Sequence, residues 1–309
     1  MNGSYAIEVR GLRKSYGDVT VLKSVDFQVE SGTMLALLGP NGAGKTTTVK
    51  IISTLLRADG GTATIHGHDI VTEPRAVRRI IGLTGQSTAV DGLLTGEENL
   101  VMMGQLFGLG GRAAKRRAAE LLEQFDLVDA GRRQAKTYSG GMRRRLDLAV
   151  SLINKPPVLF LDEPTTGLDP TSRMAMWDTI RALMAGGTTV LLTTQYLEEA
   201  DQLADRIVVI NDGLVAAEGT ADELKRRVGS ERVELTFAAP DLAMAHALYD
   251  GERIDDNTIS VPVGGVEDVR RLLNRAAETN IQVSKVALHQ PTLDDVFRSL
   301  TTPTLGGVK

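Results

Sequence analysis

The segment GPNGAGKTT, residues 39–47, has the composition of a loop that binds phosphate. It follows an apolar run, 34–38, that predicts a buried strand, and it precedes residues with helical spacing. Glycines let a backbone wrap closely around a polyphosphate, and amides at a helix start point toward an anion. Lys45 would reach the β- and γ-phosphates of a nucleotide, and the Thr46 hydroxyl would bind Mg²⁺. The predicted contacts are Gly39, Pro40, Asn41, Gly42, Ala43, Gly44, Lys45, Thr46 and Thr47.

Two carboxylates end a second apolar run, residues 158–161. A buried parallel strand brings its carboxyl end to the ligand crevice of an open α/β sheet. There Asp162 could hold Mg²⁺, since a hard cation prefers oxygen ligands. Glu163 would orient or deprotonate the water that attacks the γ-phosphate. Beside the phosphate-binding loop, this strand end predicts a site for nucleotide hydrolysis.

A second helix start with anion-binding character occurs at YSGGM, residues 138–142, which we call the signature segment. Ser139, Gly140 and Gly141 precede a helical pattern of buried type, so their amides could face a phosphate. One chain would then carry two phosphate-binding helix starts, although a simple P-loop kinase or GTPase needs one. Three basic runs, residues 112–117, 132–136 and 143–145, are expected to be solvated faces.

The wider pattern predicts an α/β protein with two domains. Alternating residues such as Val25, Phe27 and Val29 indicate a β-rich edge, and later strands alternate with helices, which implies a largely parallel sheet. Residues 87–137 change to helical spacing and predict a helical subdomain within a first domain, 1–229. A strand and helix pattern restarts afterwards, so residues 230–309 are expected to form a small, ferredoxin-like α+β accessory domain.

Composition narrows the class of protein. Hydrophobic residues make up 42% and charged residues 24%, which is ordinary for a globular protein, and there is no cysteine for disulfides or thiolate metal sites. We expect no signal peptide and no membrane helix, because no apolar run approaches the ~18 residues that a span needs. A net charge of −4 argues against nucleic acid as a partner.

GPNGAGKTT, YSGGM and VLFLDEPTTGLDP, in this order, resemble the ATP-binding subunit of an ABC transporter over roughly the first 225 residues. The resemblance implies a P-loop NTPase fold: a RecA-like core with an antiparallel β edge and a helical subdomain. It implies ATP and Mg²⁺ as ligands and ATP hydrolysis coupled to transport. It also implies a separate membrane permease, which would hold the subunit at the cytoplasmic face of the membrane. Two copies would pair head to tail, and each signature segment would meet the γ-phosphate bound by the other copy.

Further residues match the family's pattern one by one. Tyr16 stands where the family stacks an aromatic ring on adenine. Gln86 stands where a glutamine contacts Mg²⁺ and the attacking water and links to the membrane partner. Asp169, in the segment GLDP, matches the loop that crosses the dimer interface. The resemblance therefore adds these three residues to the predicted site.

Two positions depart from that pattern. Tyr138 and Met142 replace the usual leucine and glutamine of the signature segment, whereas its phosphate-facing residues are intact. Gln195 replaces a histidine that contacts the γ-phosphate, and we expect it to act in catalysis in that place. An amide can donate a hydrogen bond but carries no charge, so slow hydrolysis is expected, with nucleotide binding unaffected.

The segments TQYLEEAD at 194–201, YSGGMRRR at 138–145 and PTLDDVF at 291–297 resemble the daunorubicin-resistance subfamily, which energises drug or lipid export. Two alternatives stay open. One is a non-transport ABC ATPase acting on DNA or ribosomes. The DNA-acting type would need a long coiled coil after the P-loop, but only about 94 residues (139 minus 45) separate Lys45 from Ser139, without sustained heptads. The ribosome-acting type would carry two such domains in tandem, and the sequence shows one P-loop and one signature segment. A weakly hydrolysing regulatory module is suggested by Gln195, and intact Glu163 counts against it.

Overall fold

The computed structural model describes residues 5–85, 89–228, 231–238 and 248–301. The chain forms two compact units, Met1–Ala221 and Asp222–Lys309. The division lies at residue 221, whereas the expected domain boundary follows residue 229. Within the described residues, no helix is both long enough and apolar enough to cross a bilayer.

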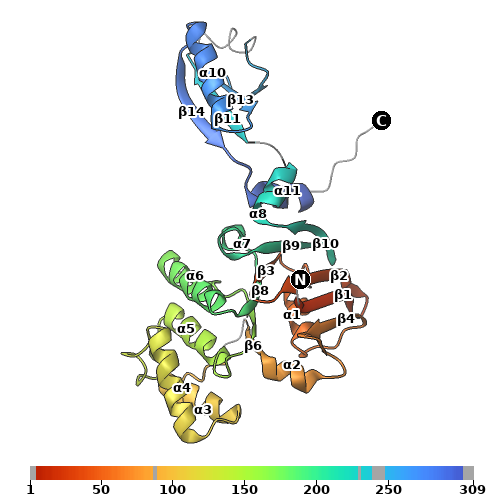
Figure 1. Ribbon diagram of the computed structural model, residues 1–309, viewed down its shortest axis with the longest axis vertical. Helices are drawn as coiled ribbons and strands as arrows, with labels where there is room; N and C mark the ends of the chain where they lie inside the picture. Colours follow the sequence, from red (N-terminus) through yellow and green to blue (C-terminus); the bar gives the residue numbers. More distant parts are fainter. Residues whose placement is uncertain (1–4, 86–88, 229–230, 239–247, 302–309) are drawn as a thin grey trace. The chain divides into compact units, whose positions relative to one another are not determined.

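The first unit is built on a ten-stranded sheet with the order β5-β4-β1-β2-β10-β9-β3-β8-β7-β6 (Figure 1). Parallel pairing joins β9, β3, β8, β7 and β6, whereas β5, β4, β1 and β2 pair antiparallel. The expected parallel core and antiparallel β edge are therefore confirmed. The strands are β1 (Tyr5–Tyr16), β2 (Val19–Glu30), β3 (Met34–Leu38), β4 (Gly60–Ile65), β5 (His68–Asp69), β6 (Ile81–Thr84), β7 (Val158–Asp162), β8 (Thr189–Thr194), β9 (Arg206–Asn211) and β10 (Leu214–Gly219).

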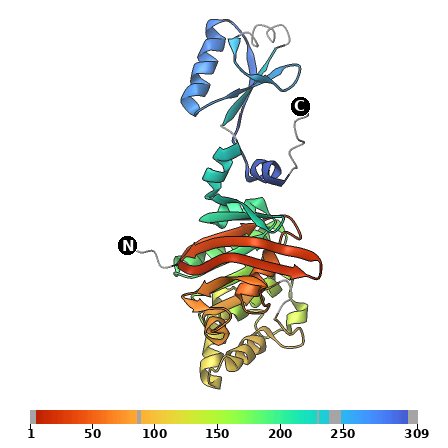
Figure 2. The same ribbon diagram turned by 90° about the vertical axis from the view of Figure 1, so that its right-hand side faces the viewer.

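The burial pattern explains which strands lie in the centre. Every residue of β3, β7 and β8 is buried, as expected for strands covered on both faces. By contrast, β2 alternates buried and more exposed residues over much of its length, and it runs beside β1 as a long antiparallel pair (Figure 2). The parallel strands therefore deliver their carboxyl ends together at one edge of the sheet.

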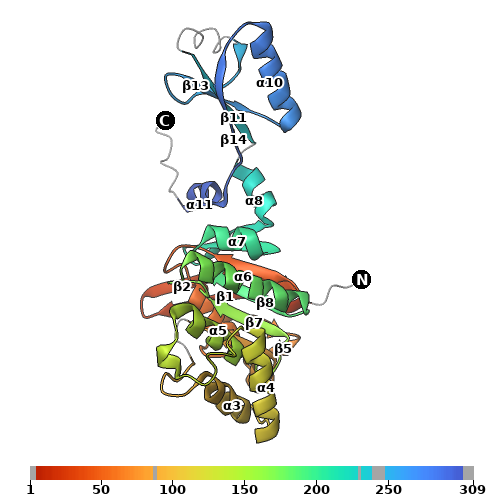
Figure 3. The ribbon, with the colours of Figure 1, turned by 90° about the vertical axis from the view of Figure 1, so that its left-hand side faces the viewer.

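Helices of the first unit follow the strands and carry the predicted helix starts. They are α1 (Lys45–Ile52), α2 (Pro74–Ile80), α3 (Gly96–Leu106), α4 (Gly111–Gln124), the 3₁₀ turn η1 (Ala135–Thr137), α5 (Gly140–Ser151), α6 (Pro170–Ala185) and α7 (Leu197–Leu203). Three of them, α3, α4 and α5, gather at one end of this unit (Figures 1 and 3). Thr95 caps α3 through a reciprocal capping box with Glu98, so the helical subdomain has a fixed start.

Tyr138 ties the signature segment to this helical subdomain. Its side chain is 6% exposed, and its hydroxyl donates to the carbonyl oxygen of Ala130 at 2.7 Å. A Cβ on Gly96 would lie 2.3 Å from the same hydroxyl oxygen, so α3 begins directly against the tyrosine. The tyrosine that departs from the family's pattern therefore packs between the start of α3 and the loop after α4.

The second unit is a small α+β structure. Its four-stranded antiparallel sheet has the order β12-β13-β11-β14. Val233, Leu235 and Phe237 from β11 and Ile259 from β13 form its core together with Tyr249. The elements are α8 (Ala221–Val228), β11 (Arg232–Phe237), β12 (Glu252–Arg253), β13 (Thr258–Pro262), α10 (Val266–Glu278), β14 (Val283–His289) and α11 (Leu293–Thr301).

Candidate active site

The phosphate-binding loop joins β3 to α1, as the sequence predicts. Gly39 follows β3 where a side chain has no room, because a Cβ there would lie 2.3 Å from the carbonyl oxygen of Ile210. Gly42 and Gly44 have φ angles of 85° and 106°, a region that L side chains rarely adopt. A Cβ on Gly44 would also lie 2.4 Å from Leu22. These three positions therefore require glycine for the loop to curve as it does.

Lys45 begins α1 and is 5% exposed. Its ammonium donates to the carbonyl oxygens of Gly39 at 2.8 Å and Pro40 at 3.2 Å. Burial lowers the pKa of Lys45, and the nearby charges of Glu163 and Asp162 partly oppose that effect. A phosphate would offer this ammonium a charged acceptor, and charge-assisted hydrogen bonds are the stronger ones.

A cavity of about 480 Å³ opens over this loop, which is within the range typical of small-molecule sites. It brings the loop together with residues that follow β7 and β8, far away in the sequence. Its lining residues are Val21, Asn41, Gly42, Gly44, Lys45, Thr46, Thr47, Glu163 and Gln195. The structure therefore gathers most of the predicted loop residues, the predicted general base and Gln195 around one cavity, whereas Gly39, Pro40 and Ala43 do not line it.

Asp162 ends β7 beside this cavity and is 4% exposed. One of its carboxylate oxygens accepts from the hydroxyl of Thr46 at 3.1 Å and also from the hydroxyl of Thr193 on β8. Carboxylate and hydroxyl oxygens at this separation suit Mg²⁺, which prefers oxygen ligands and keeps several waters. The donor set present in the chain therefore fits the expected metal, and Thr46 and Asp162 would be among its protein ligands.

Glu163 is held in an uncommon backbone conformation, with φ of 51°. Its amide donates to the carbonyl oxygen of Thr193 at 3.0 Å, and its carboxylate accepts from the Thr166 hydroxyl at 3.3 Å. Non-glycine residues with positive φ are uncommon and cluster at functional sites. The carboxylate predicted to act on the attacking water thus lies in a turn that the neighbouring strand fixes.

Gln195 is exposed at the end of β8 and lines the same cavity. The next residue, Tyr196, donates its amide proton to the Thr194 hydroxyl at 2.9 Å. The Arg173 guanidinium lies 4.9 Å from the Tyr196 ring. These contacts hold the chain on either side of Gln195, so the amide is available to the cavity while its backbone is fixed.

The signature segment lies on a different cavity. Ser139 caps α5 by accepting from the Met142 amide at 3.2 Å, and Gly140 has open space where a side chain would be. A Cβ on Gly141 would lie 2.6 Å from the Ser172 hydroxyl, so α5 packs closely on the start of α6. A second cavity of about 400 Å³ is lined by Gly140, Arg143, Arg144, Glu163, Thr166, Gly167 and Leu168. Ser139, Gly140 and Gly141 do not line the cavity over the phosphate-binding loop.

Tyr16 and Asp169, which the family's pattern added to the predicted site, do not line the loop cavity either. Tyr16 ends β1 with 49% of its surface exposed, and its ring lies 5.6 Å from the Lys14 ammonium. Asp169 caps α6 by accepting from the amide and hydroxyl of Ser172, and these bonds lower the pKa of the exposed Asp169. Gln86 lies outside the described residues. Their roles toward adenine, the dimer interface and Mg²⁺ remain predictions.

Two residues of this region were missed from the sequence. Thr193 bonds both Asp162 and Glu163, but its position in an apolar strand gives no signal of that role. Arg144 belongs to a basic run that was expected to be a solvated face. Its side chain is 12% exposed and donates to the backbone of Asp162, Glu163 and Pro164, so the expectation is wrong for this residue.

Residues 22–166 match the family model for ABC transporters, and residues 219–301 match that for the C-terminal domain of DrrA1-3-like ATP-binding proteins. The chain is 54% identical to the daunorubicin resistance ATP-binding protein DrrA2 of Streptomyces coeruleorubidus, over 96% of this chain and 95% of the relative. The chain belongs to this family of ABC ATP-binding proteins. It is also 49% identical to the doxorubicin resistance ATP-binding protein DrrA of Mycobacterium tuberculosis, over 97% and 95% of the two chains.

The fold of this ABC protein has close structural counterparts. One is a dimeric ATP-binding cassette in a post-hydrolysis state with ADP and Pi, with a TM-score of 0.63 and 26% identity, over 69% of this chain and 98% of that one. The predicted P-loop NTPase fold and the recognition of the daunorubicin-resistance subfamily are confirmed. The chain is an ABC ATPase that binds nucleotide.

Proposed function

We propose that this ABC ATPase hydrolyses ATP in sites shared between two copies and so drives export of amphipathic drugs or lipids through a separate membrane permease. The observation that supports the shared site is that the phosphate-binding loop and the signature segment lie apart within one chain. The phosphate-binding loop lines one cavity, Gly140 of the signature segment lines another, and Glu163 borders both. A second copy placed head to tail would bring its signature segment to the first cavity.

The chemistry at each shared site would be positioning and electrostatic stabilisation of the transferred γ-phosphoryl group. Lys45 and the amides of the loop would bind the phosphates. Thr46 and Asp162 would hold Mg²⁺, which when bound neutralises charge on the β- and γ-phosphate oxygens. Glu163 would orient the attacking water and accept its proton.

Gln195 would complete this arrangement from the end of β8. Its exposed amide can donate to the γ-phosphate or to the attacking water, because it lines the cavity with Glu163 and Lys45. A neutral donor stabilises developing negative charge less than a cationic one. This supports slow turnover in the absence of the permease.

The names of the relatives support the proposed class of cargo, since one is a daunorubicin resistance protein and the other a doxorubicin resistance protein. Contact with the permease is expected near Gln86 and the stretch that follows it. Large apolar side chains are exposed on the described part of the helical subdomain and beside it, at Leu93, Leu106, Phe107 and Val128. We therefore place the subunit at the cytoplasmic face of the membrane, held there by the permease.

Transport into inside-out vesicles tests the proposed function. The membrane protein that co-purifies with the full chain would be reconstituted with it, and uptake of fluorescent doxorubicin would be followed with MgATP. We expect ATP-dependent uptake with the parent chain and none with Glu163→Gln. Equal uptake with both chains would contradict the assignment of Glu163, and absence of uptake with ATP hydrolysis intact would contradict the proposed cargo class.

The weakly hydrolysing regulatory module is the second candidate, and Gln195 is the observation that favours it. Glu163 and Thr46 nevertheless line the cavity, and the Thr46 hydroxyl donates to Asp162, which counts against this candidate. Phosphate release by the full chain together with its permease distinguishes the candidates. Sustained turnover that transport substrate stimulates would favour the transporter, and a single slow turnover would favour the module.

A further inference from the structure

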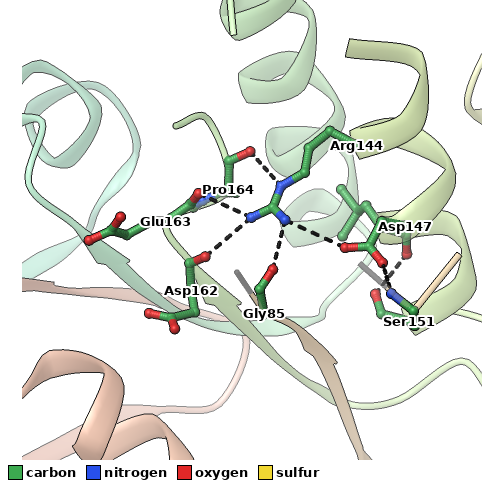
Figure 4. A network of polar contacts seen from close by, with 9 residues as sticks. Gly85, Arg144, Asp147, Ser151, Asp162, Glu163 and Pro164 are labelled. Atoms are coloured by element: carbon green, nitrogen blue, oxygen red, sulfur yellow. Dashed lines mark hydrogen bonds and ion pairs between the residues drawn. The ribbon is translucent and has the colours of Figure 1, made fainter. Parts of the chain in front are cut away.

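Arg144 lies in the second turn of α5 with all five of its N–H groups directed at acceptors (Figure 4). Four of the acceptors are backbone carbonyl oxygens, and the fifth is a carboxylate on the same helix. The contacts are Nε to Pro164 at 2.8 Å, Nη1 to Gly85 at 2.8 Å and to Asp147 Oδ2 at 3.5 Å, and Nη2 to Asp162 at 3.2 Å and to Glu163 at 3.0 Å. One side chain thus binds three consecutive carbonyls around the expected general base.

These contacts fix the backbone of Glu163 from the side opposite β8. Thr193 accepts the amide proton of Glu163, and Arg144 donates to its carbonyl oxygen. The backbone amide and carbonyl of Glu163 are therefore both hydrogen-bonded, and the φ of 51° of this residue lies in the left-handed region. Residues held in that region persist only when their surroundings determine the conformation. Arg144, on α5, is one of the residues that determine the backbone conformation of Glu163.

Asp147 holds the guanidinium in this orientation. Its carboxylate is 3% exposed on the side of α5 that bears Arg144, and its Oδ1 accepts from the amide of Ala89 at 2.8 Å. Burial raises the pKa of Asp147, and the Ala89 amide and the Arg144 charge oppose that effect. Arg144 and Asp147 together therefore attach Gly85 and Ala89, as well as the turn at 162–164, to one helix.

We propose that Arg144 is a positioning residue for ATP hydrolysis, which fixes Glu163 relative to the helix that begins at the signature segment. The proposal rests on the proposed role of Glu163 and adds a residue that acts through it. In a head-to-tail dimer, the start of α5 would serve one shared site, and Glu163 of the same chain would serve the other. Arg144 would then link the two sites, because its helix begins at one of them and its guanidinium bonds the backbone of Glu163 at the other.

Arg145, the next residue on α5, makes different contacts from Arg144 and therefore supplies a matched control. Arg145 donates to the carbonyl oxygen of Phe125 at 3.0 Å and contacts Asp126, both at the end of α4. Its side chain is 23% exposed, so it is also largely covered by protein. Arg145→Gln removes an arginine that bonds backbone near α5 without touching the turn of Glu163.

The test compares single-turnover hydrolysis of MgATP and calorimetric ATP affinity in the full chain. The main variant is Arg144→Gln with Asp147→Asn, because removing both charges leaves neither one buried and unpaired. We expect hydrolysis about 10-fold slower or more with ATP affinity within about threefold of the parent, since the interaction concerns the chemical step. Arg145→Gln should keep the rate within about twofold.

A parental rate in the double variant would overturn the proposal, as would an equal loss of rate in Arg145→Gln. Arg144→Lys covers the case in which the double variant does not fold. It keeps the charge beside Asp147, but its ammonium has three donors and cannot span the carbonyls that the planar fork reaches. The same slowing is expected, and a parental rate would again overturn the proposal. Glu163→Gln at parental rate would instead refute the role of Glu163 itself.

Discussion

Gln195 stands where the family's pattern has a histidine, so its chemistry should affect the rate of hydrolysis. A histidine there would change charge near pH ~6.5, whereas an amide does not titrate. We predict that Gln195→Ala lowers turnover about 10-fold while sparing ATP binding, which corresponds to about 1.4 kcal/mol of transition-state stabilisation. Steady-state kinetics from pH 6 to 8 on the parent, Gln195→Ala and Gln195→His is the measurement.

Gln195→His should add a pH dependence in that range that the parent lacks. If Gln195→Ala turns over as fast as the parent, the amide has no catalytic role and another group on the cavity fills it. The exposed position of Gln195 makes this comparison informative, because its removal leaves the buried strand β8 intact.

Glu199, four residues further, makes stability depend on pH. Its side chain is 0% exposed, and it accepts from the Thr165 hydroxyl at 2.9 Å and the Trp177 indole at 3.2 Å. Burial raises the pKa of Glu199 above its ordinary value of 4.5, and hydrogen bonds and Arg173 partly oppose this. Between 4.5 and the raised pKa, the folded chain binds a proton that the unfolded chain has lost. Stability from this group therefore falls as pH rises through that window.

Glu199→Gln should remove this loss, because the amide oxygen can still accept both hydrogen bonds and carries no charge to bury. We expect the free energy of unfolding of the variant, relative to the parent, to grow with pH above 4.5 until the raised pKa is passed and to stay constant beyond it. Urea unfolding across this range is the measurement. Glu198→Gln is the control, since Glu198 is 69% exposed, and surface changes usually stay within about 0.5 kcal/mol. A constant difference at all pH values would show that Glu199 is ionised throughout.

Among the elements, those that carry the loop and the carboxylates could be predicted because each gives a local signal. The apolar runs of β3 and β7 and the Ser-Gly-Gly start of α5 are visible in sequence and lie where expected. Arg144 could not be assigned in this way. Its acceptors at residues 162–164 lie 18 to 20 positions further along the chain, and they become neighbours only when α5 packs beside β7.

Other long-range contacts could not be predicted from the sequence for the same reason. Thr193 looks like any other residue of a buried strand, although its hydroxyl bonds Asp162 across the sheet. Tyr138 was noted as a departure from the family's pattern, but nothing in its neighbours indicates the hydrogen bond to Ala130. Long-range polar contacts depend on how whole elements pack, and periodicity reports only which face of an element is buried.

The hydrogen bond from Tyr138 to Ala130 joins the signature segment to the helical subdomain, and its contribution to stability can be measured. Tyr138→Phe removes a buried hydroxyl that donates to Ala130, so we expect a loss of about 1 kcal/mol in the free energy of unfolding. ATP affinity should be unchanged, because the phosphate-binding loop lies on a different cavity. Urea unfolding with Tyr5→Phe as control is suitable, since Tyr5 is 38% exposed. Equal stability of Tyr138→Phe and the parent would show that the hydroxyl bond contributes nothing net.

At the scale of the whole molecule, the first unit has one cavity over the phosphate-binding loop and another beside Gly140 of the signature segment. The second unit matches the C-terminal domain of DrrA-type proteins, and no group of three or more metal-ligating side chains occurs among the described residues of the chain. The phosphate-binding loop, Glu163 and Gln195 all belong to the first unit, so we expect that unit to carry the chemistry and the second unit to support assembly. The central claim is that the signature segment of one copy completes the ATP site of another.

Sedimentation of the Glu163→Gln chain with MgATP, with and without Ser139→Arg, tests that claim most directly. Glu163→Gln should retain ATP and accumulate a dimer, because the attacking water is no longer activated. Ser139→Arg places a large side chain where the partner's γ-phosphate must lie, so the double variant should remain monomeric and still bind ATP with nearly unchanged affinity. Equal dimer content in the two chains would contradict the shared site.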